Sequence, residues 1–305
     1  MKTSIVLSTH QAKFAAVAFK GDLRANVRKI AELGYDGVEL AIRDPNLVDA
    51  DALLAVTEAH GLSVPAIGTG QAWGEEGLSF TDPDPSVRWA AIQRVCDHVP
   101  FAARTGAVIV IGLLRGIVKP GVEHEHAHAW MADALRRCAA AAAPHGVRLA
   151  LEPINRYETT LINSVPECLA LIDAVGADNF GVLADTFHMN VEDVSMAGSL
   201  RQAGSRLFHV HFADSNRWYP GAGHIDFAGL VIALRETGYA GYVSIEALPV
   251  PDADTCAVES IRTLKGLLGQ SSRRVSSAFR ESPLAGIDMD LDRDQSDLRH
   301  DIRLD

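Results

Sequence analysis

The strongest constraint on the fold is an alternation that runs along most of the chain. Short apolar runs rich in valine, isoleucine and leucine alternate with longer amphipathic segments, which is the pattern of βα units around a parallel sheet. We expect strands at residues 4–9, 37–42, 63–68, 107–112, 148–152, 181–185, 207–212 and 242–246. We expect helices at residues 22–33, 49–60, 86–104, 125–143, 165–175, 196–203, 227–237 and 253–268. This alternation predicts an α/β fold, a closed (β/α)8 TIM barrel in a single domain.

The length of the chain fits one such barrel with a C-terminal extension. The 305 residues exceed the roughly 250 that a (β/α)8 barrel typically needs. After Gly269 the composition changes, because residues 270–305 contain Phe279 as their one aromatic residue and interleave serine, arginine and aspartate. Such a segment buries too little apolar surface to offset the entropy lost on ordering. We therefore predict a barrel domain over residues 1–269 and a polar, disordered tail over residues 270–305, in which residues 296–303 can form a short helix.

Charge and composition argue against several classes of partner. The chain has 28 Lys and Arg residues against 39 Asp and Glu residues, and this acidic balance opposes binding to nucleic acid and to anionic membranes. The longest strongly apolar run, residues 107–114, is far shorter than the roughly 20 residues that span a bilayer. The four cysteines lie far apart without a Cys-x-x-Cys pair, and no apolar stretch of signal-peptide length follows the first residues. We therefore expect a reduced, cytoplasmic protein.

The last four predicted strands each end in a residue able to bind a metal ion. These residues are Glu152, Asp185, His211 and Glu246, spaced by 33, 26 and 35 residues. Each alone also fits a helix cap or a local ion pair, but in a (β/α)8 barrel the carboxyl ends of consecutive strands form one reactive face. Three carboxylates there would repel one another unless a cation compensated their charge. The ligand set predicts one divalent metal ion, with Mn²⁺ first and Mg²⁺, Co²⁺, Fe²⁺ or Zn²⁺ as alternatives.

The sequence around these residues resembles a known family. The strings concerned are LEPINRYE (residues 151–158), ADTFHMN (184–190), HVHFADSNRW (209–218) and VSIEALP (243–249). They resemble the sugar isomerase/epimerase branch of the xylose-isomerase-like TIM barrels. Within that branch they are similar to ketose 3-epimerases of the D-tagatose and D-psicose type, and more closely to the 5-keto-L-gluconate epimerases of inositol catabolism.

This resemblance implies roles for individual residues. It implies that the four strand-end residues hold the metal and that Glu152 and Glu246 also serve as acid and base. It implies substrate contacts from Glu158, His188 and Arg217. Members of the family are often dimers or tetramers, so a homo-oligomer that binds a small sugar or keto-sugar acid is the expectation that follows.

Two carboxylates on different strands suit an epimerisation. Inverting a carbon next to a ketone removes its proton from one face and returns a proton to the other face. Glu152 and Glu246 can approach a substrate from different sides, so we expect one to deprotonate C3 and the other to reprotonate it through a metal-stabilised enediolate. The predicted activity is that of a carbohydrate epimerase, which is an isomerase.

Two loop residues bear on the substrate. Arg115 follows the predicted strand 107–112, and its guanidinium would bind a carboxylate in a bidentate fork. This favours a keto-hexuronate over a neutral ketohexose, although a solvent-exposed loop arginine is the alternative. Gln71 lies in the loop after the strand 63–68, which we expect to close over the substrate.

Several alternatives stay open at this stage. Glu39 and Arg43 either support the metal site or pair with each other, and Arg217 has Asp214 as an alternative partner. His188 has an alternative role as a helix-entry residue bonded to the backbone. Competing functions on the same barrel are an aldose–ketose isomerase of the hydroxypyruvate type, an inosose dehydratase, and a sugar-binding barrel without catalysis.

Overall fold

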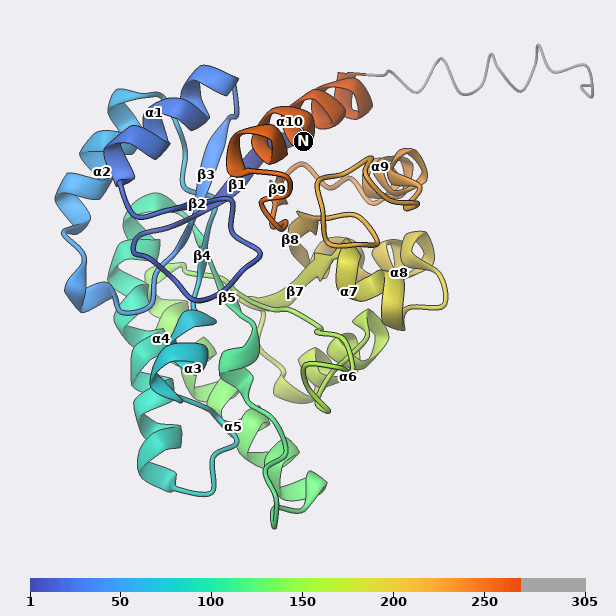
Figure 1. Ribbon diagram of the computed structural model, residues 1–305. Coiled ribbons are helices and arrows are strands. Elements are labelled where there is room, and N and C mark those ends of the chain that lie inside the picture. Colours follow the sequence, from blue (N-terminus) through green and yellow to red (C-terminus); the bar gives the residue numbers. More distant parts are fainter. Residues whose placement is uncertain (270–305) are drawn as a thin grey trace, which may run out of the picture. The chain divides into compact units, whose positions relative to one another are not determined.

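A closed barrel of parallel strands forms the centre of the computed structural model, which describes residues 1–269 (Figure 1). Its strands are β1 (Lys2–Ser8), β3 (Gly37–Ala41), β4 (Ala66–Gly68), β5 (Val108–Ile111), β6 (Leu149–Leu151), β7 (Phe180–Asp185), β8 (Leu207–Phe212) and β9 (Tyr242–Ile245). They pair in this order, and β9 pairs back onto β1, which closes the sheet. The predicted TIM barrel is confirmed. The predicted tail and its short helix lie outside the described residues.

The helices follow the strands and surround the barrel (Figure 1). They are α1 (Leu23–Leu33), α2 (Ala50–Ala59), α4 (Pro85–Thr105), α5 (His124–Ala142), α6 (Val165–Val175), α8 (Met196–Ala203), α9 (Phe227–Glu236) and α10 (Ala253–Gly269). All correspond to predicted helices. The structure adds a short strand, β2 (Phe19–Lys20), and two helices, α3 (Gln71–Glu76) and α7 (Thr186–Glu192). These two helices have at most two turns, which is too short for a helical period to show in the sequence.

Side-chain caps explain where many helices begin. The N-cap residues whose side chains accept a hydrogen bond from the first turn include Asp22, Asp49, Asp84, Ser164, Ser195 and Asp226. Such caps satisfy main-chain N–H groups that have no partner within the helix. At the other end, Gly34 closes α1 with φ of 82°, a conformation that glycine adopts without steric cost.

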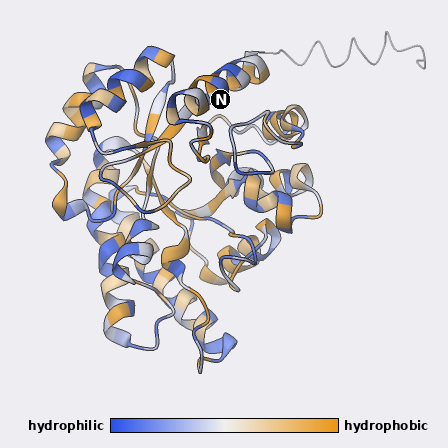
Figure 2. Cartoon of the chain, in the orientation of Figure 1, coloured by the Kyte–Doolittle hydropathy of each residue, from blue (hydrophilic) through white to orange (hydrophobic). Residues whose placement is uncertain are grey.

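Two apolar layers hold the barrel together. The larger one lies between the strands and the helices, and the helices carry hydrophobic and hydrophilic residues in turn along their ribbons (Figure 2). A smaller cluster joins buried side chains of four neighbouring strands, β4 to β7: Ala66, Val108, Val110, Ala150 and Leu183. These small aliphatic residues fill one side of the barrel interior, as expected for a TIM barrel.

The other side of the barrel interior is polar. Glu39 on β3 and His209 on β8 are both about 1% exposed, and their side chains lie 2.8 Å apart. β3 and β8 are separated in the sheet by β1 and β9, so this contact crosses the interior. Glu39 also bonds to His211, which lies nearer the carboxyl end of β8, so this buried polar pair adjoins the carboxyl ends of the strands.

Two further findings concern the described part of the chain. None of the helices within residues 1–269 is long and apolar enough to cross a membrane. The four cysteines Cys96, Cys138, Cys168 and Cys256 are free thiols. Among them, Cys96 on α4 and Cys138 on α5 lie close enough for a side-chain hydrogen bond between their thiols.

Candidate metal and substrate site

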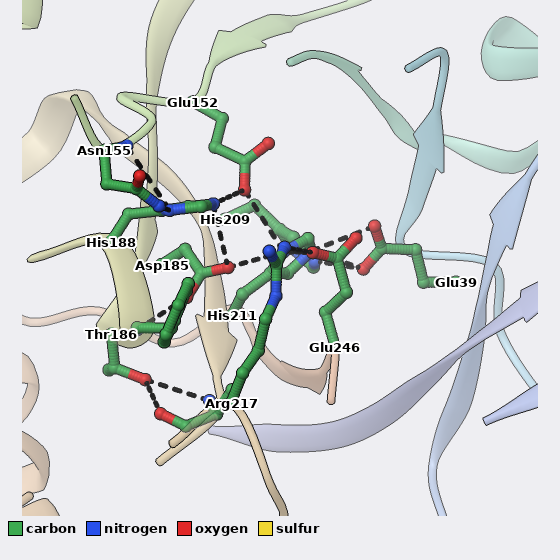
Figure 3. Close-up of polar contacts among 12 residues, drawn as sticks. Glu39, Glu152, Asn155, Asp185, Thr186, His188, His209, His211, Arg217 and Glu246 are labelled. Carbon is green, nitrogen blue, oxygen red and sulfur yellow. Dashed lines mark hydrogen bonds and ion pairs between the residues drawn. The ribbon is translucent and has the colours of Figure 1, made fainter. Parts of the chain in front are cut away.

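The four residues selected from the sequence converge at the carboxyl ends of four neighbouring strands. Glu152 follows β6, Asp185 ends β7, His211 lies in β8 and Glu246 follows β9. One ligand atom from each lies within 4.8 Å of the others. His211 Nδ1 is 3.8 Å from the nearest oxygen of each of the three carboxylates. Figure 3 shows these side chains pointing toward a common centre.

Three atoms of this cluster are buried without a hydrogen-bond partner. They are Glu152 Oε1, Asp185 Oδ2 and His211 Nδ1. Buried polar atoms are normally paired, because leaving one unpaired costs about 1–3 kcal/mol. All three atoms face the same point, and all three can donate an electron pair. The residues therefore fit a divalent cation, which would satisfy them together.

The acidity of the carboxyl groups reflects the same crowding. Burial, and then the charge of Glu246, raise the pKa of Glu152 well above its ordinary value. Burial also raises the pKa of Asp185, and it raises the pKa of Glu246 to about 7 although His211 and Arg217 oppose the shift. The cluster thus favours either bound protons or a bound cation, which is the electrostatic situation of a metal site.

A second cluster lies directly behind His211 and differs in its bonding. Glu39 Oε2 is 2.8 Å from His209 Nε2, and both oxygens of Glu39 are 3.0 Å from His211 Nε2. Here both Glu39 oxygens and both Nε2 atoms take part in hydrogen bonds, whereas the ligand atoms of Glu152, Asp185 and His211 in the first cluster are unpaired. A proton on His211 Nε2 leaves Nδ1 with a free electron pair directed at the first cluster. We therefore interpret the second cluster as support for the first.

The charges of this supporting cluster follow from its contacts. Burial alone would raise the pKa of Glu39, but His211 and His209 together hold the pKa of that carboxyl well below its usual value. The predicted alternative of a Glu39–Arg43 pair is wrong, because Arg43 binds Glu75 at 3.0 Å instead. The sequence feature that indicates a functional role for Glu39 is its position as the one charged residue of an otherwise apolar strand.

Arg217 lies beside the cluster, between two carboxylates and two aromatic rings. Its guanidinium lies 3.2 Å from Glu158 Oε1 and 3.4 Å from Glu246 Oε2. The rings of Phe14 and Phe187 lie 5.3 Å and 4.8 Å from its central carbon. Arg217 adopts a φ of 61°, a conformation that is uncommon for a residue with a side chain. Strained residues of this kind concentrate at functional sites.

The predicted alternative in which Arg217 pairs with Asp214 is wrong for the side chains. Only the main chains meet, where the Arg217 N–H donates to the Asp214 carbonyl at 2.7 Å. The Asp214 carboxylate instead accepts hydrogen bonds from the N–H groups of Ser215, Gly221 and Ile225. These bonds shape the loop after β8 and leave Arg217 free to face the site.

His188 on α7 lies at the edge of the ligand cluster. Its Nε2 is 3.9 Å from Glu152 Oε1 and 4.0 Å from Asp185 Oδ2. Its Nδ1 faces Asn155, whose side-chain nitrogen is 2.7 Å away. Burial, together with the positive charge of Arg217, lowers the pKa of His188 well below its ordinary value. One ring nitrogen thus binds Asn155 and the other faces the site, and the predicted substrate contact stays a prediction.

A pocket of about 290 Å³ opens over the ligand atoms. On one side it is lined by the charged residues just described. On the other side its wall is mostly apolar and includes Phe14, Val17, Trp73, Leu113 and Ile154. Gln71 also lines this wall; its Nε2 donates to Ser8 Oγ at 3.0 Å, and its buried Oε1 has no partner. The pocket thus combines a polar floor with an apolar wall, as sites for small molecules commonly do.

The structure places Arg115 away from this pocket, which corrects its predicted role at the mouth of the barrel. Its side chain is fully buried, and its Nη1 donates to the main-chain oxygen of Glu152. The reason is the turn of 3-10 helix at Leu113–Arg115, which directs Leu113 to the pocket wall and Arg115 beneath it. Burial lowers the pKa of Arg115 to about 10. A substrate carboxylate at the pocket has no access to this guanidinium.

Comparisons with known proteins agree with the fold. A sequence model of the family described as "Xylose isomerase-like TIM barrel" matches residues 27–267. The L-ribulose 3-epimerase of Methylomonas sp. (strain DH-1) is 32% identical over 240 residues, which cover 76% of this chain and 82% of that protein. The D-psicose 3-epimerase of Ruminiclostridium cellulolyticum is 31% identical over 240 residues, which cover 75% and 79%.

A solved structure shows the same likeness in three dimensions. The D-allulose 3-epimerase from Methylomonas sp. in complex with D-allulose has a TM-score of 0.73 and 26% identity, covering 87% of this chain and 99% of that chain. The names of these relatives are those of epimerases, which are isomerases acting on carbohydrates. They confirm the predicted class of enzyme.

Proposed function

Because the chain belongs to the xylose isomerase-like TIM barrel family, we propose that it is a divalent-metal-dependent epimerase that inverts C3, the carbon next to the ketone of a ketose. The observation that carries this proposal is the set of buried, unpaired ligand atoms of Glu152, Asp185 and His211 beside Glu246. These four residues would hold the ion, with Mn²⁺ as the first candidate. When bound, the ion supplies positive charge that stabilises the negative charge developing next to the ketone.

Glu152 and Glu246 form the proposed proton-transfer pair. Each carboxylate directs one oxygen at the ligand centre and keeps its other oxygen available. Glu152 Oε2 occupies the space that a side chain at Gly112 would fill, because a Cβ there would lie 2.9 Å from it. Glu246 is oriented by Arg217. One glutamate removes the proton from C3, the other returns a proton to the opposite face, and their roles exchange with the direction of reaction.

The remaining polar groups of the pocket bind and orient the sugar. His188 faces the site with Nε2, and Arg217 has donors in a fixed plane beside Glu158 and Glu246. Glu158 orients Arg217 or a neighbouring hydroxyl group of the sugar. Gln71 Oε1 is an unpaired acceptor, so we assign it to a sugar hydroxyl at the far end of the pocket.

The charges of the pocket favour a neutral ketose as substrate. Among the described residues that line it, the cationic side chains are Lys13 and Arg217. Arg217 is already shared between two carboxylates, and Lys13 lies at the exposed rim. A keto-hexuronate of the 5-keto-L-gluconate or D-tagaturonate type would add a carboxylate to a site rich in carboxylates. Since Arg115 is buried, we rank this substrate second to a ketohexose or ketopentose.

Incubation in D₂O tests the proposal and its alternatives together. Metal-loaded protein is mixed with a panel of ketoses and keto-hexuronates, and the products are analysed by NMR. The proposal predicts deuterium at C3 with inversion and with the carbonyl still at C2. A carbonyl that moves to C1 would indicate the aldose–ketose isomerase, and loss of water would indicate the inosose dehydratase. Sugar binding without incorporation of deuterium would indicate a binding protein and would contradict the proposal.

A further inference from the structure

Asn155 lies in the loop after β6, buried beside the ligand cluster. It is 2% exposed and bonds to three different groups. Its Oδ1 accepts from the main-chain N–H of Tyr157 at 3.0 Å. Its Nδ2 lies 3.0 Å from Glu158 Oε1 and 2.7 Å from His188 Nδ1. Figure 3 shows Asn155 directly beside the ring of His188.

These partners fix the orientation of the Asn155 amide. A main-chain N–H can only donate, so the atom that faces Tyr157 must be the amide oxygen. An ionised carboxylate can only accept, so the atom that faces Glu158 must be the amide nitrogen. Both constraints select the same orientation. The two hydrogens on Nδ2 therefore go to Glu158 and to His188.

It follows that His188 Nδ1 is an acceptor. The amide nitrogen of Asn155 donates to it, and the main-chain N–H of Asn155 points at the same atom from 3.4 Å. The main-chain contact is long, but in it Asn155 is the donor whichever orientation the side-chain amide adopts. A ring nitrogen that accepts a hydrogen bond carries no proton, and an imidazole then carries its proton on the other nitrogen. The proton of His188 is therefore on Nε2.

The Nε2–H group of His188 faces the pocket and has no hydrogen-bond partner within residues 1–269. Its closest acceptors, oxygens of Glu152 and Asp185, are 3.9 Å and 4.0 Å away, which is beyond hydrogen-bonding distance. A donor held at the edge of the ligand cluster is suited to a sugar oxygen. The opposite tautomer would present a lone pair, which cannot donate a hydrogen bond to the ketone oxygen or to an oxygen that develops negative charge.

We propose that Asn155 is a positioning residue that holds His188 in the Nε2–H tautomer, so that the ring presents a hydrogen-bond donor to an oxygen of the bound ketose. This inference rests on the proposed function for the identity of the ligand. The tautomer itself does not depend on catalysis. Within this assignment His188 binds and stabilises charge, and the proton transfer at carbon stays with the two glutamates.

The test is to replace the donor at position 155 by an acceptor. In Asn155→Asp, a carboxylate replaces the amide nitrogen, so we expect the proton of His188 to move to Nδ1. The double variant Asn155→Asp, Glu158→Gln restores a donor–acceptor pair between positions 155 and 158 and keeps the net charge. ¹⁵N NMR of histidine-labelled, Mg²⁺-loaded protein distinguishes the two ring nitrogens, and His188→Gln identifies the signal. We expect Nε2–H in the wild type and Nδ1–H in both variants.

Activity on a ketose should follow the tautomer. Loss of one donor to a developing negative charge typically lowers kcat about 10²- to 10³-fold, and we expect a loss of this size in both variants with little change in Mn²⁺ affinity. Asn163→Asp is the matched control. Asn163 stabilises the same loop through the carbonyls of Ile154 and Thr159 and does not contact His188, so the tautomer should stay unchanged.

Three outcomes would overturn the inference. They are an Nδ1–H tautomer in the wild type, an unchanged tautomer in both the single and the double variant, and a changed tautomer with unchanged kcat. If the wild type turns over no ketose but shows the predicted tautomers, the proposed function fails and the Asn155–His188 arrangement stands. If activity is present but the tautomers are wrong, the inference about Asn155 fails alone.

Discussion

The two halves of the barrel contribute different chemistry to one pocket. Strands β6 to β9 supply the ligand cluster, so all its charge comes from the second half of the barrel. Strands β1 to β5 and their loops supply most of the apolar wall. Glu39 is an exception to this division. It is a charged residue of the first half whose side chain crosses the barrel interior and bonds to His209 and His211.

This division indicates how reaction and recognition are separated. A site for proton transfer needs fixed charge in a fixed geometry, and adjacent parallel strands provide it because their ends are hydrogen-bonded to one another. A wall that selects among sugars needs only shape and a few polar groups, which short loops and α3 provide. Substitutions of the same kind should therefore have unequal effects in the two halves.

The largest effect is expected from neutralising the glutamates of the second half. Glu152→Gln and Glu246→Gln each remove an acid or base and a metal ligand, so kcat should fall by about 10⁴-fold. Steady-state kinetics on the best ketose from the deuterium assay measure the loss, and circular dichroism checks the fold. Activity near that of the wild type in either variant would contradict the proton-transfer pair.

Glu75→Gln is the matched control from the first half. Glu75 lines the same pocket but pairs with Arg43 and His10. A partly exposed ion pair is worth about 1 kcal/mol or less, so the change in kcat should stay below about tenfold. Equal losses of kcat in Glu75→Gln and Glu246→Gln would contradict the assignment of proton transfer to the second half of the barrel.

An intermediate effect is expected from Glu39, a residue of the first half that bonds to His209 and His211 of the second half. Glu39→Gln weakens the acceptor for His211 Nε2–H, so the free electron pair on Nδ1 is less well directed. Loss of such a supporting partner typically weakens metal binding about 10- to 100-fold. Calorimetric titration of apo protein with Mn²⁺ measures this change. An affinity equal to that of the wild type would mean that Glu39 serves stability alone.

The smallest effect is expected from a buried histidine of the first half, remote from the ligands. His98 on α4 is fully buried, and neither ring nitrogen has a hydrogen-bond partner among the described residues. Burial, and then the charge of Arg94, lower its pKa to about 3. Below pH 6.5 the unfolded chain therefore takes up a proton at His98 that the folded protein does not. The free energy of unfolding is highest, as far as His98 is concerned, above pH 6.5 and decreases as the pH falls toward 3.

His98→Phe isolates this contribution. The difference in unfolding free energy between wild type and variant should change by about 1.4 kcal/mol per pH unit below pH 6.5. Urea unfolding at pH 7.5 and pH 5.0 measures it. Parallel losses in both proteins over this range would show that His98 does not titrate in the way its burial implies.

Much of the fold and the ligand set could be predicted because both depend on local sequence. Strands and helices followed from the alternation of apolar runs and amphipathic segments, and only short elements such as α3 and α7 were missed. Glu152, Asp185, His211 and Glu246 each sit at the end of an apolar strand, so their position along the barrel axis follows from the strand itself. Their convergence confirms that part of the site geometry.

Other features depended on contacts between distant segments. Arg115 is two residues beyond a pocket residue, Leu113, yet one tight turn moves it from the mouth into the interior. Glu39 reaches His211 only because the sheet closes and brings β3 opposite β8.

The sequence by itself therefore determined which elements form and which side chains lie at the carboxyl ends of the strands, because strand register and burial depend on short-range pattern. Only the tertiary structure decided which nitrogen of His188 and of His211 faces the site. It also decided that Arg115, the arginine expected to bind a substrate carboxylate, is buried. These properties depend on the direction of individual side chains and on partners 33 and 172 positions away in the chain. No local pattern specifies such partners, since closure of the barrel creates them.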